Sequence, residues 1–372
     1  MNTEPQLLGV MDDDRRVAPC LQDGPLSNVA REFIRVTRGL GDTTLASVLR
    51  VSCVPYLFRS MELDFATDES PIPLLTSRLT SLSDCLQRIT DCGIAILGIP
   101  EVLPNRALTH KTTLAVTGEH YGQLFSAFSD DSYFREPTQL LRERLLRNGF
   151  DLSRFCGTKV LDAGCGGGRY TVAWRLLGAA IATGIDTSEI GITDARRRAQ
   201  QAEIDGVTFE HGDVLRLPFP DSSFDVVFSN GVLHHTVNWR AGVAEVVRVL
   251  RPGGFGWLYV IENPGGLFWD IIEILRVIMK DESRDRARST LEFLGIPANR
   301  SFYMLDHVMV PINIRCTPEE VAQTLAESGA CNIQRLERGV AFDRIEQIYQ
   351  KDPFARDKYG VGENRFVFSK PL

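Results

Sequence analysis

Short apolar runs, glycine-rich turns and helical patterns alternate through the middle of the chain. Residues 159–161 predict the end of a buried strand, because a short β-branched and aliphatic run stands directly before a glycine segment. The glycines cannot support a strand or a helix interior, and "RYTVAWRLLGA" then places apolar residues at helical spacing. The pattern predicts strand, glycine loop and helix, which is the first βα turn of a doubly wound α/β domain.

The same alternation continues towards the C-terminus. Further strands are predicted in "AIATGID", at residues 207–211, in "FDVVFSN" and in "FGWLYVIE", with a closing pair in "CNIQRLERG" and "NRFVFSK". In "RVLRPGG", Pro252 and the glycines after it supply the helix stop and the turn before the fifth strand. Thr317 and Glu320 form a predicted capping box for the helix in "TPEEVAQTLAESG". Near the N-terminus, "LSNVAREFIRVTRGL" and "PLLTSRLTSLSDCLQRITDCGIAIL" have helical periodicity.

The glycine loop carries an acid-x-G-x-G-x-G motif built from Asp162, Gly164, Gly166 and Gly168. A dinucleotide fingerprint counted from Gly164 would need a glycine where Arg169 stands, which weakens a nicotinamide-dependent oxidoreductase as the rival function. S-adenosylmethionine has no phosphate, and its amino group and sulfonium are cationic. A carboxylate beside the loop therefore suits it electrostatically.

Two acids at the ends of later strands extend this interpretation. Asp186 ends the second strand, 24 residues after Asp162, where a carboxylate can accept hydrogen bonds from both ribose hydroxyls. Asp213 follows the third strand and can accept from an adenine amino group, with Val214 donating through its backbone.

Residues from about 118 to 262 resemble the class I S-adenosylmethionine-dependent methyltransferases of the UbiE/type 11 group. The resemblance rests on "VLDAGCGGGRYT", "GIDTSE", "GDVLRLPFPDSSFDVVFSNGVLHH" and "EVVRVLRPGG" in the right order and spacing. It implies a Rossmann-like, seven-stranded α/β sheet with the last strand antiparallel, and methyl transfer by in-line displacement. "EHYGQLFSAFSDDSYF" resembles the lead-in of these enzymes and nominates Tyr121 and Phe125 near the cofactor. The predicted cofactor-binding residues are Tyr121, Asp162, Gly164, Cys165, Gly166, Asp186, Thr187, Asp213, Val214, Ser229 and Asn230.

Composition narrows the classes of partner. The formal net charge is −7 and no basic stripe occurs, which disfavours a nucleic-acid partner. The apolar stretch "LFWDIIEILRVIM" contains three charges and predicts an amphipathic helix rather than a membrane span. The N-terminus is acidic and lacks the apolar core of a signal peptide, so we expect a cytoplasmic protein. The eight cysteines form no C-x-x-C pair, so we expect neither a metal site nor a disulfide framework.

At 372 residues the chain exceeds one methyltransferase core. Residues 1–114 predict a mostly helical region that acts as a lid or as the contact of a homodimer, and residues 115–372 predict the methyltransferase domain. Residues 263–316 interrupt that domain, and insertions here cover the acceptor pocket in related enzymes. The aromatic residues of this insertion and His307 are therefore pocket candidates, although ordinary packing is the preferred interpretation for each. The charged stretch "KDESRDRARST" predicts a solvated face or a mobile loop.

Methyl transfer needs alignment of nucleophile, methyl group and sulfur more than it needs acid–base groups. His234 and His235 follow the fourth strand, where a histidine could take the proton of a hydroxyl acceptor. Glu262 ends the fifth strand and could hold a cationic acceptor. Structural roles compete for all three candidates. The predicted function is transfer of a methyl group to an oxygen, nitrogen or carbon atom of a small molecule in specialised metabolism. The alternative is a protein that binds S-adenosylmethionine without transferring its methyl group.

Overall fold

A computed structural model of the chain describes residues 23–92 and 131–372. The described residues divide into two compact units. The first, here the helical unit, comprises residues 23–92, 265–310 and 351–360. The second, here the sheet unit, comprises residues 131–264, 311–350 and 361–372. The residue stretches of the two units are interleaved along the chain.

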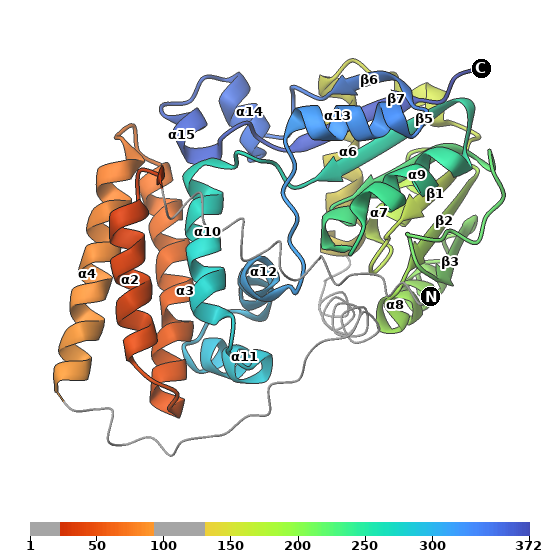
Figure 1. Ribbon diagram of the computed structural model, residues 1–372. Coiled ribbons are helices and arrows are strands. Elements are labelled where there is room, and N and C mark those ends of the chain that lie inside the picture. The colour runs from red at the N-terminus through yellow and green to blue at the C-terminus, as the bar shows by residue number, and fades with distance from the viewer. Residues whose placement is uncertain (1–22, 93–130) are drawn as a thin grey trace, which may run out of the picture. The chain divides into compact units, whose positions relative to one another are not determined.

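The helical unit combines the N-terminal helices with the segment between the fifth and sixth strands. Its helices are α2 (Ser27–Gly39), α3 (Thr44–Phe65), α4 (Pro71–Asp91), α10 (Gly266–Met279), α11 (Arg284–Phe293), α12 (Ala298–Met309) and α15 (Ala355–Tyr359). Figure 1 shows α2, α3, α4 and α10 side by side, and α3 also contacts α11 and α12. On α4 the buried residues Leu75, Leu79 and Leu86 follow the helical spacing that the sequence predicts.

Polar contacts connect the three chain segments of the helical unit. The Glu282 carboxylate accepts a hydrogen bond from Arg50 Nε at 2.5 Å and another from the Ser47 hydroxyl. Lys358 Nζ donates to the backbone carbonyl oxygens of Phe65 at 2.9 Å and Thr67 at 3.1 Å. These bonds attach the other two segments to α3 and to the turn after it, so the segment from 265 to 310 shares one core with the N-terminal helices.

The sheet unit contains a seven-stranded sheet in the order β3-β2-β1-β4-β5-β7-β6. The strands are β1 (Lys159–Ala163), β2 (Ile181–Asp186), β3 (Val207–His211), β4 (Phe224–Asn230), β5 (Leu250–Val260), β6 (Cys331–Arg335) and β7 (Asn364–Ser369). Strands β1 to β5 pair in parallel, and β7 runs antiparallel to both β5 and β6. This topology confirms the predicted α/β class with an antiparallel last strand.

Helices cover both faces of the sheet. They are α6 (Glu136–Arg147), α7 (Arg169–Leu176), α8 (Glu189–Gln201), α9 (Trp239–Val249) and α13 (Pro318–Glu327). The unit also contains α14 (Arg344–Tyr349) and the short turns η2 (Asp131–Arg135), η3 (Leu152–Phe155) and η4 (Leu233–His235). Neighbouring strand residues face opposite cores: Leu161 and Val227 pack with α9 and α13, whereas Val160 and Phe228 pack with α6 and α7. The parallel strands therefore bring five carboxyl ends to one edge, where ligands of such sheets bind.

Three local features differ from the sequence interpretation or refine it. The charged stretch after α10 forms helix α11, because Ser283 caps it and Ala287 and Leu291 bury an apolar face. Strand β5 begins at Leu250, before Pro252, directly after α9 ends, and its pairing with β4 shifts register between Phe224 and Val226. The predicted capping box of α13 is confirmed.

Within the described ranges 23–92 and 131–372, none of the helices has the length and apolar character needed to cross a membrane.

Candidate cofactor and acceptor site

The loop between β1 and α7 is shaped by glycines in left-handed conformations. Gly164, Gly166 and Gly168 have φ values of 86°, 54° and 80°. A Cβ added to Gly164 would lie 2.3 Å from Val232 Cγ1, and one added to Gly168 would lie 2.5 Å from Phe209 Cε1. Larger residues therefore meet both backbone strain and steric overlap here. The loop has the bare backbone that a closely bound ligand requires.

Asp186 brings two of the predicted motifs together. Its Oδ2 accepts a hydrogen bond from the backbone N–H of Gly166 at 2.8 Å, and its Oδ1 accepts from the N–H of Ser188 at 2.8 Å. The backbone N–H groups of Gly164 and Cys165 also donate to the carbonyl oxygen of Ile185. Burial raises the pKa of Asp186, while the bonds from Gly166 and Ser188 favour its charged form. The carboxylate after β2 thus holds the glycine loop after β1.

Asp162 lies beneath this loop on β1. Its side chain is only 2 % exposed, and its Oδ2 accepts a hydrogen bond from the Thr171 hydroxyl of α7 at 2.7 Å. Burial raises its pKa to about 7. A cationic group placed nearby would favour the charged carboxylate, which fits the predicted positive charge of the cofactor.

The loop after β3 contains the residues predicted to contact adenine. Gly212 N–H donates to the carbonyl oxygen of Asp186, so this loop lies beside the end of β2. Asp213 is partly exposed and its Oδ1 accepts from Leu215 N–H at 2.8 Å, whereas Val214 is buried in the core. His211 Nε2 lies 3.1 Å from the carbonyl oxygen of Thr187, a further predicted cofactor residue. The structure therefore gathers the predicted residues after β1, β2 and β3 at one sheet edge.

Strand β4 ends in Ser229 and Asn230, both predicted from the sequence. The Ser229 side chain is fully buried, and its Oγ has no hydrogen-bond partner among residues 23–92 and 131–372. Asn230 Oδ1 accepts a hydrogen bond from Trp257 Nε1 at 3.1 Å, which fixes the amide orientation. Asn230 is thus tied to β5.

The two adjacent histidines follow β4 in turn η4. Their ring centroids lie 4.1 Å apart, and His234 is 3 % exposed. His235 Nδ1 lies 2.8 Å from the carbonyl oxygen of Ile312, and the carbonyl oxygen of His234 accepts from Ile314 N–H. A carbonyl oxygen only accepts, so His235 Nδ1 carries the proton and Nε2 has the lone pair in the neutral ring. This tautomer is the one that a general base at Nε2 needs.

Glu262 already has a cationic partner. It is fully buried and pairs with Arg344 at 2.8 Å, and Arg344 Nη2 also lies 3.4 Å from the Tyr259 hydroxyl. Burial raises the pKa of the Tyr259 hydroxyl. The carboxylate is therefore neutralised within the protein, which favours a structural role for it over binding of a cationic acceptor.

A larger buried ionic network adjoins this pair and was missed from the sequence. Asp343 accepts two hydrogen bonds from Arg144 at 2.8 Å and pairs with Arg365 at 3.0 Å. Glu363 accepts from the backbone N–H groups of Arg344 and Ile345 at the start of α14. The partners stand far apart in the sequence and have no motif spacing, so no sequence signal could have paired them.

Several remaining candidates lie elsewhere. Tyr121 and Phe125 lie outside the described residues. His307 belongs to the helical unit, where its ring packs within 6.1 Å of Phe58, Phe268, Trp269 and Tyr303 and its Nδ1 bonds the carbonyl oxygen of Tyr303. This environment is consistent with the packing role preferred from the sequence.

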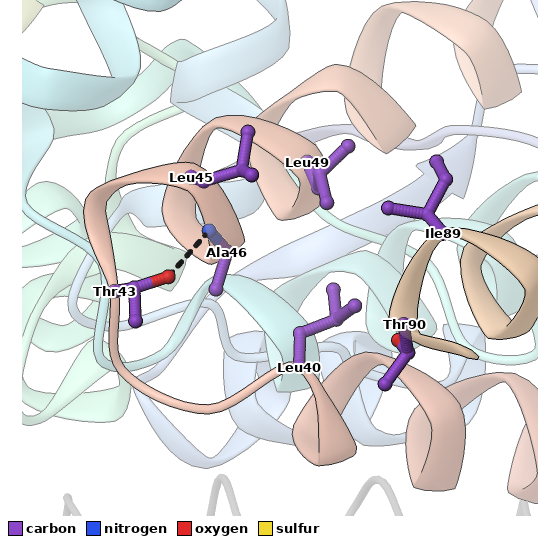
Figure 2. A pocket seen from close by; sticks show the side chains of 7 residues that line it. All are labelled: Leu40, Thr43, Leu45, Ala46, Leu49, Ile89 and Thr90. Atoms are coloured by element: carbon purple, nitrogen blue, oxygen red, sulfur yellow. Dashed lines mark hydrogen bonds between the residues drawn. The ribbon is translucent and has the colours of Figure 1, made fainter. Parts of the chain in front are cut away.

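Two hollows among the described residues lie away from the candidate site. One of them, in the helical unit, is lined by Leu40, Thr43, Leu45, Ala46, Leu49, Ile89 and Thr90 (Figure 2). The other is a shallow hollow on the face of α8, lined by Glu189, Ile190, Thr193, Asp194 and Arg197. Neither is lined by a predicted site residue, so the candidate site is defined by the strand ends and their loops.

Comparisons with known proteins agree with this geometry. Residues 161–258 match the family model described as "Methyltransferase domain". The chain is 37 % identical over 147 residues to 27-O-demethylrifamycin SV methyltransferase of Amycolatopsis mediterranei, covering 38 % of this chain and 54 % of that protein. It is 42 % identical over 100 residues to phthiotriol/phenolphthiotriol dimycocerosates methyltransferase of Mycobacterium tuberculosis, covering 27 % and 36 %. It is 40 % identical over 109 residues to fatty-acid O-methyltransferase of Mycolicibacterium smegmatis, covering 29 % and 38 %.

The sheet order, the glycine loop and the family match over residues 161–258 show that this part of the chain is a methyltransferase domain with the class I S-adenosylmethionine-dependent fold. This finding confirms the resemblance drawn from the sequence motifs. The matches span about half the length of the first of these relatives and less of the other two.

Proposed function

We propose that this protein transfers the methyl group of S-adenosylmethionine to a nucleophilic atom of a small molecule in specialised metabolism, with a hydroxyl or carboxyl oxygen favoured over nitrogen or carbon. One observation carries the cofactor part of the proposal: the Asp186 carboxylate bonds the backbone of Gly166 inside the glycine loop. Two motifs predicted to bind one ligand are thereby in direct contact. The names of the rifamycin and fatty-acid relatives support a small oxygen-containing acceptor.

Each predicted cofactor residue has a distinct task in this proposal. When bound, S-adenosylmethionine supplies an electrophilic methyl group on a sulfonium, which is a good leaving group. The glycine loop would accept the methionyl part against bare backbone, and Asp162 would favour its positive charge. Asp186 would accept bonds from the ribose hydroxyls through its remaining lone pairs, and Asp213 would bind the adenine amino group.

The acceptor side is assigned to the ends of β4 and β5. His235 would remove the acceptor proton at Nε2, since its Nδ1 is occupied by the Ile312 carbonyl oxygen. His234 is buried against His235 and would hold that ring in place. Alignment of the nucleophile with the methyl group would supply most of the remaining rate enhancement.

We further propose that residues 1–114 act as a lid or a dimer contact rather than as a catalytic domain. The support is that α3 packs on α10 and α11, so this region shares a core with the segment predicted to cover the acceptor. Light scattering on the full chain distinguishes the two roles. A dimer would favour the contact, and a monomer would favour the lid.

The test of the proposed function separates cofactor binding from turnover. Calorimetry on the full chain should show binding of S-adenosylmethionine and S-adenosylhomocysteine but not of NADH. Release of S-adenosylhomocysteine is then measured with decanoate and with hydroquinone as acceptor probes, using Asp186→Ala as the cofactor-site control. Binding without product from any acceptor would favour a protein that binds S-adenosylmethionine without transferring methyl. No binding of either cofactor form would overturn the proposal.

A further inference from the structure

Residues 311–316 form a non-helical segment in the sheet unit that runs past the ends of two central strands. At one end, the Ile312 carbonyl oxygen accepts from His235 Nδ1, and Ile314 N–H donates to the carbonyl oxygen of His234. At the other end, Cys316 N–H donates to the Ile261 carbonyl oxygen at the end of β5. The segment is therefore bonded both to the histidine turn after β4 and to β5.

Asn313 stands between the two residues of this segment that bond the histidines. Its side chain is 3 % exposed, and its Nδ2 has no hydrogen-bond partner in the described part of the chain. A buried amide donor without a partner is unfavourable, because it has lost its hydrogen bonds to water and gained none. An apolar residue of similar size would avoid this cost at the same position.

A second buried asparagine beside the same segment shows the contrast. Asn364 on β7 is fully buried, and its Nδ2 donates to the carbonyl oxygen of Cys316 at 2.6 Å. The amide donor of Asn364 thus has a structural task, namely to hold the segment against the sheet. The amide donor of Asn313 has no such task within the described residues.

We propose that Asn313 binds the methyl acceptor, by donating a hydrogen bond from Nδ2 to a carbonyl-type oxygen next to the atom that receives the methyl group. This inference rests on the proposed methyl transfer. The acceptor class is a carboxylate, or a hydroxyl compound with a neighbouring carbonyl oxygen, since an amide NH₂ only donates.

The position in the sheet favours the acceptor over the cofactor as the ligand of Asn313. The predicted cofactor residues Asp162, Asp186 and Asp213 belong to β1, β2 and the loop after β3. The Asn313 segment is instead bonded to the turn after β4 and to the end of β5. In the strand order these two strands lie on the other side of β1 from β2 and β3. The backbone on both sides of Asn313 is bonded to the histidine pair, where the acceptor proton would be removed.

The experiment compares Asn313→Leu with the matched control Asn364→Leu in the full chain. Saturated with S-adenosylhomocysteine, Asn313→Leu should melt at the wild-type temperature or about 2–4 °C above it, because an unpaired donor is removed. Asn364→Leu should melt lower, because a paired donor is removed. Calorimetric affinity for S-adenosylhomocysteine should be unchanged in Asn313→Leu.

Acceptor binding is then measured on protein already saturated with S-adenosylhomocysteine, so turnover is not required. Decanoate should bind Asn313→Leu about tenfold more weakly than wild type, whereas decanol, which lacks the carbonyl oxygen, should bind both equally. The assignment would be overturned if Asn313→Leu melted at a lowered temperature, as Asn364→Leu should, or if Asn313→Leu lost affinity for S-adenosylhomocysteine. It would also be overturned if wild type and Asn313→Leu bound decanoate equally, or if neither bound it. Failure of wild type to bind S-adenosylhomocysteine would instead overturn the proposed function.

Discussion

Replacement of Gly164 by alanine tests whether the glycine loop is shaped by its own packing. The structure gives two separate penalties for the new Cβ. The backbone has a φ of 86°, which is strained for any residue with a Cβ. The Cβ would also lie 2.3 and 2.4 Å from the two γ-methyl groups of Val232 and 2.8 Å from its Cβ. Before any ligand is considered, the loop and the segment after β4 must move apart.

The expected destabilisation is the sum of these two terms. Left-handed backbone strain costs about 1–2 kcal/mol for a non-glycine residue, and overpacking typically costs about 1–3 kcal/mol. We therefore expect Gly164→Ala to lower the free energy of unfolding by about 2–5 kcal/mol. Val232→Ala removes the two closest atoms but neither the strain nor the 2.8 Å contact. The double variant should therefore recover only the overlap, with a favourable coupling of about 1 kcal/mol or more.

This coupling is measured by urea unfolding of wild type, the two single variants and the double variant. Calorimetry measures the affinity of each protein for S-adenosylhomocysteine. Gly164→Ala should also weaken that binding, because the displaced loop carries the Gly166 N–H that bonds Asp186. An unfolding free energy within about 0.5 kcal/mol of wild type would refute the strain argument. Purely additive effects of the two substitutions would refute the overlap with Val232.

Three further substitutions test individual carboxylates. Asp186→Ala should weaken S-adenosylhomocysteine binding by about 1.5–3 kcal/mol in calorimetry, because charge-assisted hydrogen bonds are lost; unchanged affinity would show that the cofactor site is misplaced. Burial opposes the charged form of Asp343, but the bonds from Arg144 and Arg365 lower the pKa of its carboxyl group to about 2. This carboxylate therefore stabilises the fold by about 2 kcal/mol above pH 4, and it loses that effect as the pH falls towards 2. Asp343→Asn should flatten the acid limb of the unfolding curve, and an unaltered limb would contradict the pairing. Burial raises the pKa of Asp162 to about 7, so the folded protein holds a proton that the unfolded chain releases above pH 4. The free energy of unfolding of the cofactor-free protein should therefore fall between pH 4 and 7. Asp162→Asn should remove this pH dependence when it is measured by urea unfolding.

The cofactor loop was predictable because its information is local. Glycines at positive φ, a strand before them and a helix after them all lie within about twenty residues, and each step follows from short-range sterics. The strands at 207–211 and 224–230 were predicted with the bounds that the structure shows. Their apolar patterns are set by burial on both faces of a parallel sheet, which the sequence records directly.

Helices with long-range partners were harder to predict. Helix α3 had no assignment from the sequence, and its apolar residues lie on both sides of it, because Val51, Val54 and Leu57 are buried whereas Tyr56 and Leu63 are exposed. Such a helix lacks the one-sided pattern that periodicity detects. The charged stretch at 280–290 was predicted as a solvated face or a mobile loop, and it contains part of α11, whose charged residues Asp285 and Arg288 are exposed. Its few apolar residues become informative only when α3 is present as a partner.

The sequence by itself therefore determined the sheet class, the glycine loop and the acids that follow the first three strands, because these depend on backbone conformation and on residues close in the chain. Only the tertiary structure decided that Val232 occupies the space beside Gly164, that Arg344 neutralises Glu262, and that the Asn313 amide donor has no hydrogen-bond partner among residues 23–92 and 131–372. These contacts join residues that are distant in sequence. Their energies depend on burial and hydrogen-bond geometry, which exist only once the strands have brought their carboxyl ends to one edge.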